Sequence, residues 1–97
     1  MSNHHPRPTL PPEATVDEAR RYIRALVRWV GTGFHPDTDF HDYVRGDSGQ
    51  RSFEARDADA LNADLDRAIR AMNAAGIDPV EIALPVQRRL LRQMGVR

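Results

Sequence analysis

Apolar residues recur at helical spacing over residues 16–30, and the two ends of this stretch carry helix boundary signals. The apolar positions share one face: Val16, Ala19, Tyr22, Ile23, Leu26, Val27, Trp29 and Val30. The arginines fall on the opposite face: Arg20, Arg21, Arg24 and Arg28. Thr15 and Glu18 have capping-box spacing at the start, and Gly31 ends the stretch. The pattern predicts an amphipathic helix with one core face and one basic face.

A second helix is predicted over residues 55–75, where the apolar seam is narrower. The seam consists of Ala58, Leu61, Leu65, Ala68, Ile69 and Met72. Acidic residues crowd the first half of this stretch and arginines the second, which is the order that the helix dipole favours. Gly76 ends the helix.

A third helix is predicted to begin after Asp78, with Pro79 at its first position and Glu81 placed to complete a capping box. Pro85 lies inside this helix and is expected to kink it. The apolar arc is wider than a surface helix needs: Val80, Ile82, Ala83, Leu84, Val86, Leu90, Leu91 and Met94. This helix is therefore either central in the fold or in contact with a partner.

Helical periodicity fails over residues 31–54, but four of the six aromatic residues lie there: Phe34, Phe40, Tyr43 and Phe53. Large rings bury much apolar area, so we expect this loop to be ordered and to fold back over the helices. The turn-rich residues 46–49, between Tyr43-Val44-Arg45 and residues 50–53, are compatible with a short β-hairpin.

The first 14 residues hold four of the seven prolines and almost no bulky apolar side chains. This composition predicts a disordered tail over residues 1–14, followed by a single domain over residues 15–97. The predicted fold class is all-α: three helices, with an ordered aromatic-rich loop between the first and the second.

Charge and composition narrow the function classes. The net charge is zero, but residues 1–30 carry +2, residues 31–66 carry −6 and residues 67–97 carry +4. The chain has no cysteine, which excludes disulfides and thiolate zinc sites, and no apolar run reaches the roughly 20 residues that span a bilayer. We therefore expect a cytoplasmic protein without a membrane segment.

The stretch around residues 33–43 concentrates residues that could carry chemistry: His35, Asp37, Asp39, His41 and Asp42. If this segment were extended, alternate side chains would point the same way and could bind zinc, iron or manganese. The same residue types also build turns and caps, so a structural turn is the favoured interpretation and metal binding an alternative. No recognisable nucleophile motif accompanies His35, and we expect neither enzymatic activity nor a cofactor.

Gly33-Phe34-His35-Pro36-Asp37-Thr38, with the aromatic and acidic residues after it, resembles a segment shared by a group of small bacterial proteins of uncharacterised function. The resemblance covers residues 22–84, and its specific part is residues 33–44. It implies a helical fold and no particular activity.

Residues 71–84 approximate the turn and second helix of a helix-turn-helix, and Arg88, Arg89 and Arg92 could contact phosphate. The neutral net charge argues against nucleic acid as the partner, so a DNA-binding regulator is the second hypothesis. The leading hypothesis is a non-enzymatic protein-interaction module or homodimer. It would use the wide arc of residues 80–94 or an aromatic and acidic surface formed by Trp29, Phe34, His35, Asp37, Asp39, Phe40, His41 and Tyr43.

Overall fold

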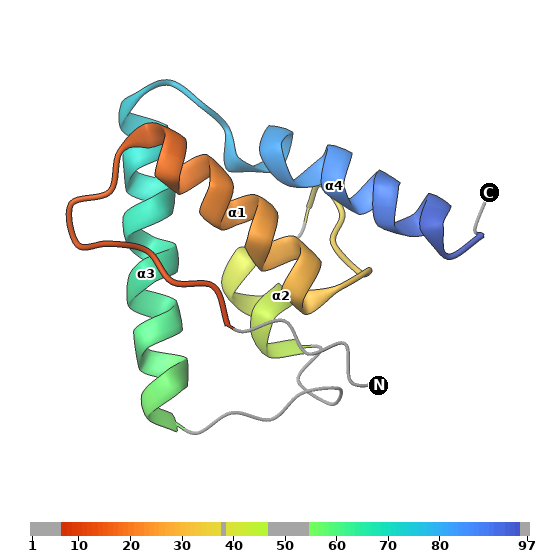
Figure 1. Ribbon diagram of the computed structural model, residues 1–97, viewed down its shortest axis with the longest axis horizontal. Helices are drawn as coiled ribbons and strands as arrows, with labels where there is room; N and C mark the ends of the chain where they lie inside the picture. The colour runs from red at the N-terminus through yellow and green to blue at the C-terminus, as the bar shows by residue number, and fades with distance from the viewer. Residues whose placement is uncertain (1–6, 38, 47–54, 96–97) are drawn as a thin grey trace.

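Helices dominate the computed structural model, which describes residues 7–37, 39–46 and 55–95. Its helices are α1 (Val16–Val30), α2 (Phe40–Gly46), α3 (Ala55–Ala74) and α4 (Pro79–Gln93). Figure 1 shows α1 crossing in front of α3, with α4 running away from the top of α3. The prediction of an all-α fold with three long helices is confirmed.

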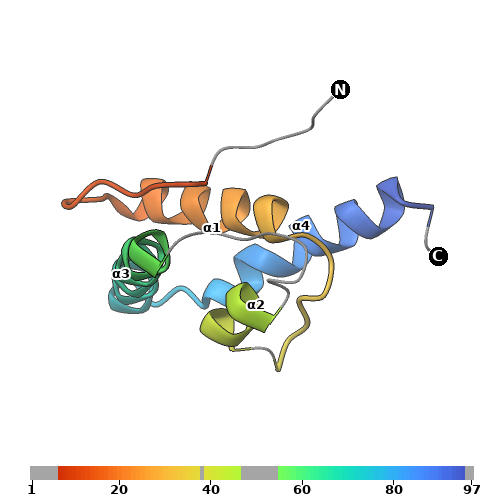
Figure 2. The same cartoon turned by 90° about the horizontal axis from the view of Figure 1, so that it is seen from below.

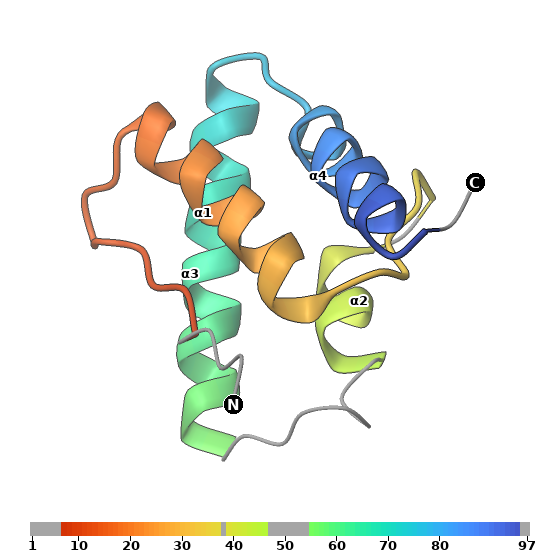
Figure 3. The same cartoon turned by 45° about the vertical axis from the view of Figure 1, so that its right-hand side comes forward.

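Helix α1 is the centre of the arrangement. It contacts both α3 and α4 extensively, whereas α3 and α4 meet each other at few positions. Figure 3 shows α1 lying between these two helices, and Figure 2 shows α2 on the side of the molecule opposite α1. The α1 sequence suits this place because its apolar arc is broad enough to serve two neighbours.

Local capping fixes where α1 and α4 begin. The Thr15 hydroxyl accepts a 3.1 Å hydrogen bond from the amide of Glu18, and the Glu18 carboxylate accepts one of 2.9 Å from the amide of Thr15. This is the predicted capping box. At α4, the Asp78 carboxylate accepts from the amide of Val80 at 3.0 Å, and Pro79 follows the cap. The helix continues past Pro85 to Gln93.

The core forms where the apolar faces of these helices meet. Its largest fully buried side chains are Ile23, Leu26, Val27, Val44, Leu61, Leu65 and Met72. Four residues of the predicted seam of α3 are in the core, Leu61, Leu65, Ala68 and Met72, and Ile69 packs at its edge. The side chain of Ala58, the first residue of the seam, lies outside what the structure describes. No helix among the described residues combines the length and apolarity needed to cross a membrane.

The proposed β-hairpin is wrong in its first strand. Tyr43, Val44 and Arg45 lie in α2, and its second strand falls on residues 50–53, outside the described part of the chain. The Asp39 carboxylate accepts a 2.8 Å hydrogen bond from the amide of His41 and so caps α2. The helical conformation also places Phe40, Tyr43 and Val44 on one buried face, which alternating strand positions would have split.

The expected disordered tail is also wrong for residues 7–14, which pack along the helices. We call residues 7–14 the strap. Leu10 is only 5% exposed and belongs to the core cluster. In Figure 1 the strap, drawn in red, crosses in front of α3 to the left side and then rises to the start of α1. A single apolar residue among prolines is too weak a sequence signal to predict this, but α3 supplies partners for its backbone. Residues 1–6 lie outside the described part.

Candidate functional site

Three of the aromatic residues expected at an interaction surface are instead buried together. The ring centroids of Phe34 and Phe40 lie 5.0 Å apart, and those of Phe34 and Tyr43 lie 5.4 Å apart in an edge-to-face arrangement. The Tyr43 hydroxyl donates to the carbonyl oxygens of Val27 and Gly31 at the end of α1. Trp29 is partly buried and packs against the same core. These rings hold the loop against the helices. Phe34, Phe40 and Tyr43 are buried, so a partner could not contact them on the surface of this fold.

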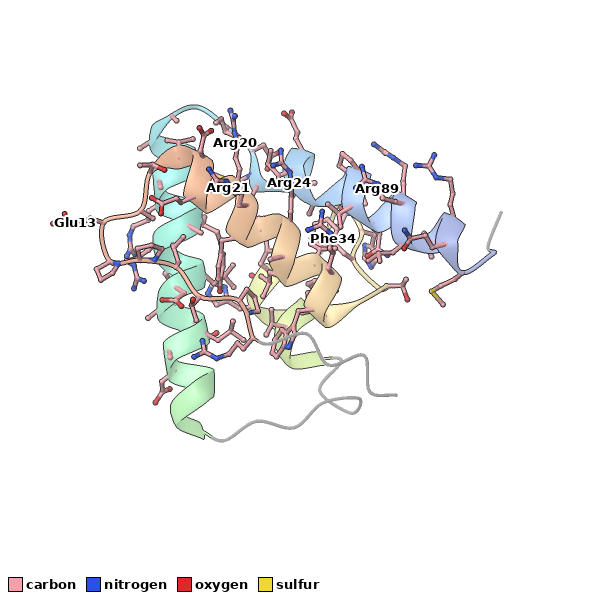
Figure 4. All side chains as sticks on the ribbon, viewed as in Figure 1. Glu13, Arg20, Arg21, Arg24, Phe34 and Arg89 are labelled. Atoms are coloured by element: carbon pink, nitrogen blue, oxygen red, sulfur yellow. The ribbon has the colours of Figure 1, made fainter. Side chains whose placement is uncertain are left out.

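Gln87 is the buried polar residue that links this loop to α4. Its side chain is 4% exposed, and its Oε1 accepts a 2.9 Å hydrogen bond from the backbone amide of Phe34. Its Nε2 has no hydrogen-bond partner among the described residues. Figure 4 shows Phe34 beside the end of α1, next to α4. The buried backbone amide of Phe34 needs an acceptor, and Gln87 supplies it. This hydrogen bond therefore holds residues 31–34 against α4.

The acidic and histidine residues of this segment do not converge on one point. His35 and Asp37 are exposed, and Asp39 caps α2. His41 turns toward α3 instead, where its Nε2 lies 2.8 Å from Oδ1 of Asp66; its Nδ1 lies 3.6 Å from Oδ1 of Asp39. Both ring nitrogens of His41 therefore face a carboxylate.

This geometry bears on the metal alternative for His35, Asp37, Asp39 and His41. Within the described ranges, no three histidine or carboxylate side chains gather closely enough to hold an ion. The segment is helical from Phe40 onward, so the extended conformation that would align alternate residues is absent there. The arrangement supports the structural interpretation: one carboxylate caps a helix and one imidazole ties α2 to α3.

A second polar cluster holds the strap to α3. Asp64 is its centre: Oδ1 accepts from Arg67 at 2.6 Å, and Oδ2 accepts from the amide of Leu10 at 3.3 Å and lies 3.9 Å from Arg7. Arg67 also donates to the carbonyl oxygen of Leu10 at 2.8 Å. Both backbone groups of Leu10 are thus satisfied by side chains of α3, which offsets the cost of burying them.

Tyr22 lies under this cluster. Its hydroxyl donates to the carbonyl oxygen of Leu61 at 3.5 Å, and its ring is 3% exposed. Burial, with a smaller contribution from the charge of Asp64, raises the pKa of Tyr22 well above its ordinary value of 10.0. The same environment makes the tyrosinate form unfavourable in the folded protein.

Helix α4 leaves part of its apolar stripe uncovered. Ala83, Val86 and Gln87 are buried, Leu90 and Leu91 are partly exposed, and Met94 is 65% exposed. Met94 follows Ala83 by about three helical turns and so continues the same face. Figures 1 and 2 show that the last turns of α4 extend beyond α1 and α3. We call residues 88–94 the projecting end of α4.

Comparisons with known proteins do not identify a relative. No family model matches the chain, and no curated protein or solved structure matches it significantly. The resemblance of residues 33–38 to a group of small bacterial proteins therefore stays a prediction.

Two features of the structure were not predicted from the sequence. One is the set of hydrogen bonds from Asp64 and Arg67 to the backbone of Leu10, which we call the clamp, and the other is the acceptor role of the buried Gln87. The signal for Gln87 was present, because it falls on the seam of Ala83, Leu90 and Met94. A glutamine in an apolar seam indicates a buried backbone group that needs a partner. The clamp joins residues 54 and 57 positions apart, which no local pattern reveals.

Proposed function

We propose that this protein is a non-enzymatic interaction module that docks an acidic amphipathic helix of a partner protein on the projecting end of α4. The observation that carries the proposal is the apolar stripe of α4, which is buried at Ala83 and is bare at Met94. Exposed methionine beside leucine is typical of surfaces that accept amphipathic helices, because the flexible thioether adapts to its partner.

The positive charge around the projecting end of α4 indicates an acidic partner. Residues 82–97 contain four arginines and no acidic residue. Arg88, Arg89 and Arg92 are exposed, and Figure 4 shows Arg89 on the outer side of α4. A partner with carboxylates flanking its apolar stripe would complement this surface. Pairing of α4 with α4 of a second copy would bring arginines together, so a second copy is the poorer occupant.

The apolar stripe also separates a protein partner from nucleic acid. Contacts with phosphate need only the arginines. Covering the exposed parts of Leu90, Leu91 and Met94 is favourable only when the covering surface is apolar. Removing this surface from water is worth about 25 cal/mol per Å². Binding to a helix therefore uses both features of the projecting end.

The test uses the full chain and a fluorescent synthetic helix with leucines at helical spacing and glutamates beside them. Fluorescence anisotropy should show saturable binding, and Met94→Glu should weaken it by more than about tenfold, or 1.4 kcal/mol. Gln93→Glu is the matched control, because it adds the same charge one residue away, off the stripe, and should cost much less. Duplex DNA is run as a second probe.

Equal losses in the two variants, or binding of duplex DNA in preference to the acidic helix, would overturn the proposal. So would a failure of the acidic helix to bind at low salt. A loss confined to Met94→Glu would support it, because only that change removes the bare apolar contact.

A further inference from the structure

A cleft separates the strap from α1, on the side of the molecule opposite the projecting end of α4. Its volume is about 280 Å³, close to the small end of the range for ligand pockets, roughly 300–1,000 Å³. The strap forms one wall with Pro8, Thr9, Leu10 and Pro11, and α1 forms the other with Glu18, Arg21, Tyr22 and Ala25. A ligand of amino-acid size matches this space.

The interior of the cleft is apolar. Pro8, Leu10 and Pro11 line one wall, and Tyr22 and Ala25 line the other. Tyr22 uses its hydroxyl elsewhere, on the carbonyl oxygen of Leu61, so it offers the cleft its ring. The small side chain of Ala25 leaves room that a larger residue would fill. These surfaces suit an aliphatic or aromatic side chain.

Both charged residues of the cleft lie one helical turn apart on α1. Glu18 accepts from the amide of Thr15 through Oε1, and its second carboxylate oxygen, Oε2, is a further acceptor. Arg21 is exposed and forms no ion pair within the described ranges. The backbone and hydroxyl of Thr15, and then Arg21, lower the pKa of Glu18, so its carboxylate is charged at neutral pH. The cleft therefore offers one negative and one positive group.

We propose that this cleft binds an apolar α-amino acid in its zwitterionic form. The α-carboxylate pairs with the guanidinium of Arg21, the α-ammonium pairs with Glu18, and the side chain enters between the prolines and Tyr22. A planar guanidinium can hold a carboxylate through two parallel hydrogen bonds, which fixes the orientation of the ligand. A ligand with only one of the two charges would leave the other rim group unpaired.

The strap couples this site to α3. Asp64 and Arg67 hold the backbone of Leu10, so they also hold the wall that Leu10 and its neighbours form. A bound amino acid would contact both walls and would therefore slow opening of the strap, because a ligand stabilises the state that binds it.

The experiment is an NMR titration of the full-length ¹⁵N-labelled protein with L-phenylalanine. The amides of Leu10, Tyr22 and Ala25 should shift and saturate. Phenethylamine lacks the carboxylate, 3-phenylpropionate lacks the ammonium and glycine lacks the side chain. Each should bind at least about tenfold more weakly, since one lost interaction of 1.4 kcal/mol has that effect.

Matched variants assign the rim groups. Arg21→Gln and Glu18→Gln should each weaken L-phenylalanine binding at least about tenfold. Glutamine keeps the capping box at position 18, so the start of α1 is preserved. Arg28→Gln, the same change of charge two turns later, should leave binding unchanged. If no amide shifts saturably, if the analogues bind as well as L-phenylalanine, or if Arg21→Gln binds normally, the proposal is wrong. The analogue series decides the matter even if a variant fails to fold.

Discussion

The backbone amide of Phe34 and Oε1 of Gln87 form a 2.9 Å hydrogen bond in the interior. It joins the loop after α1 to the middle of α4, between residues 53 positions apart. Gln87→Leu would leave the amide of Phe34 without an acceptor, at a cost of about 1–3 kcal/mol. Removing the unpartnered Nε2 offsets part of this. We expect a net loss of about 1 kcal/mol in urea denaturation.

Hydrogen exchange gives the more specific readout for this bond. The amide of Phe34 should exchange faster in Gln87→Leu than in the native protein, while amides in the centre of α3 change only with global stability. Gln93→Leu, on the exposed side of the same helix, is the control. An unchanged exchange rate at Phe34 would show that the hydrogen bond does not hold the loop.

The strap should contribute measurably to stability through Leu10. Leu10→Ala is expected to lower the free energy of unfolding by about 2 kcal/mol, at the low end for a buried leucine because the strap can relax. Thr9→Ala, at the exposed neighbouring position, should change it by less than about 0.5 kcal/mol. Limited proteolysis within residues 7–14 should accelerate in Leu10→Ala alone. Equal cleavage of both variants would mean that Leu10 does not anchor the strap.

Asp64 should also contribute to stability, because it binds the backbone of the strap at Leu10. Asp64→Asn keeps the size of the side chain but removes the charge that Arg67 and the amide of Leu10 use, which we expect to cost about 1.5 kcal/mol. Asp59→Asn changes an exposed carboxylate on the same helix and serves as the control in thermal unfolding. Similar midpoints for the two variants would refute the central place of Asp64 in the clamp.

Asp39 is predicted to act as a helix cap. Asp39→Ala should destabilise the protein by about 1 kcal/mol, whereas Asp39→Asn should cost less because asparagine also caps well. Thermal unfolding with and without added zinc distinguishes this role from metal binding. A rise in midpoint with zinc that His35→Ala or His41→Ala abolishes would contradict the structural interpretation of this segment.

Tyr22 should make the protein sensitive to alkali. Its pKa is raised in the folded state, so above pH 10 the unfolded chain loses the Tyr22 proton while the folded chain retains it. The stabilising contribution is complete below pH 10 and declines as the pH rises toward the folded-state pKa. Urea denaturation should therefore show a decline in stability above pH 10 that is smaller in Tyr22→Phe. Parallel declines in both proteins would exclude Tyr22 as the cause.

The long helices could be predicted from sequence because their signals are local. The caps lie within one turn of the backbone groups that they bind: Thr15 and Glu18 at α1, and Asp78, followed by Pro79, at α4. The apolar spacing of residues 16–30 repeats over four turns. Helix α2 has seven residues, too few for the periodicity to emerge. The cap at Asp39 agrees with the favoured interpretation of residues 33–43 as turns and caps, but the sequence did not indicate that a helix follows it.

The candidate sites were harder to predict because they depend on long-range packing. The packing of α1 and α4 determines whether the aromatic rings of the loop face solvent or the core. In the structure Phe34, Phe40 and Tyr43 are buried in the core. The apolar arc of α4 is wider than the part that the rest of the fold covers, and Met94 stays exposed. Which part stays uncovered depends on where α1 ends relative to Leu90 and Met94, and the sequence of α4 does not contain that information.

Methyl NMR of the projecting end of α4 tests the central claim most directly. On addition of the acidic amphipathic helix, the methyl groups of Leu90, Leu91 and Met94 should shift together and saturate, while those of Ile23 and Leu65 in the core stay in place. The shifts should persist in Gln93→Glu and be lost in Met94→Glu. Shifts spread over other surfaces, or none at saturating probe, would contradict the docking of a partner helix on α4.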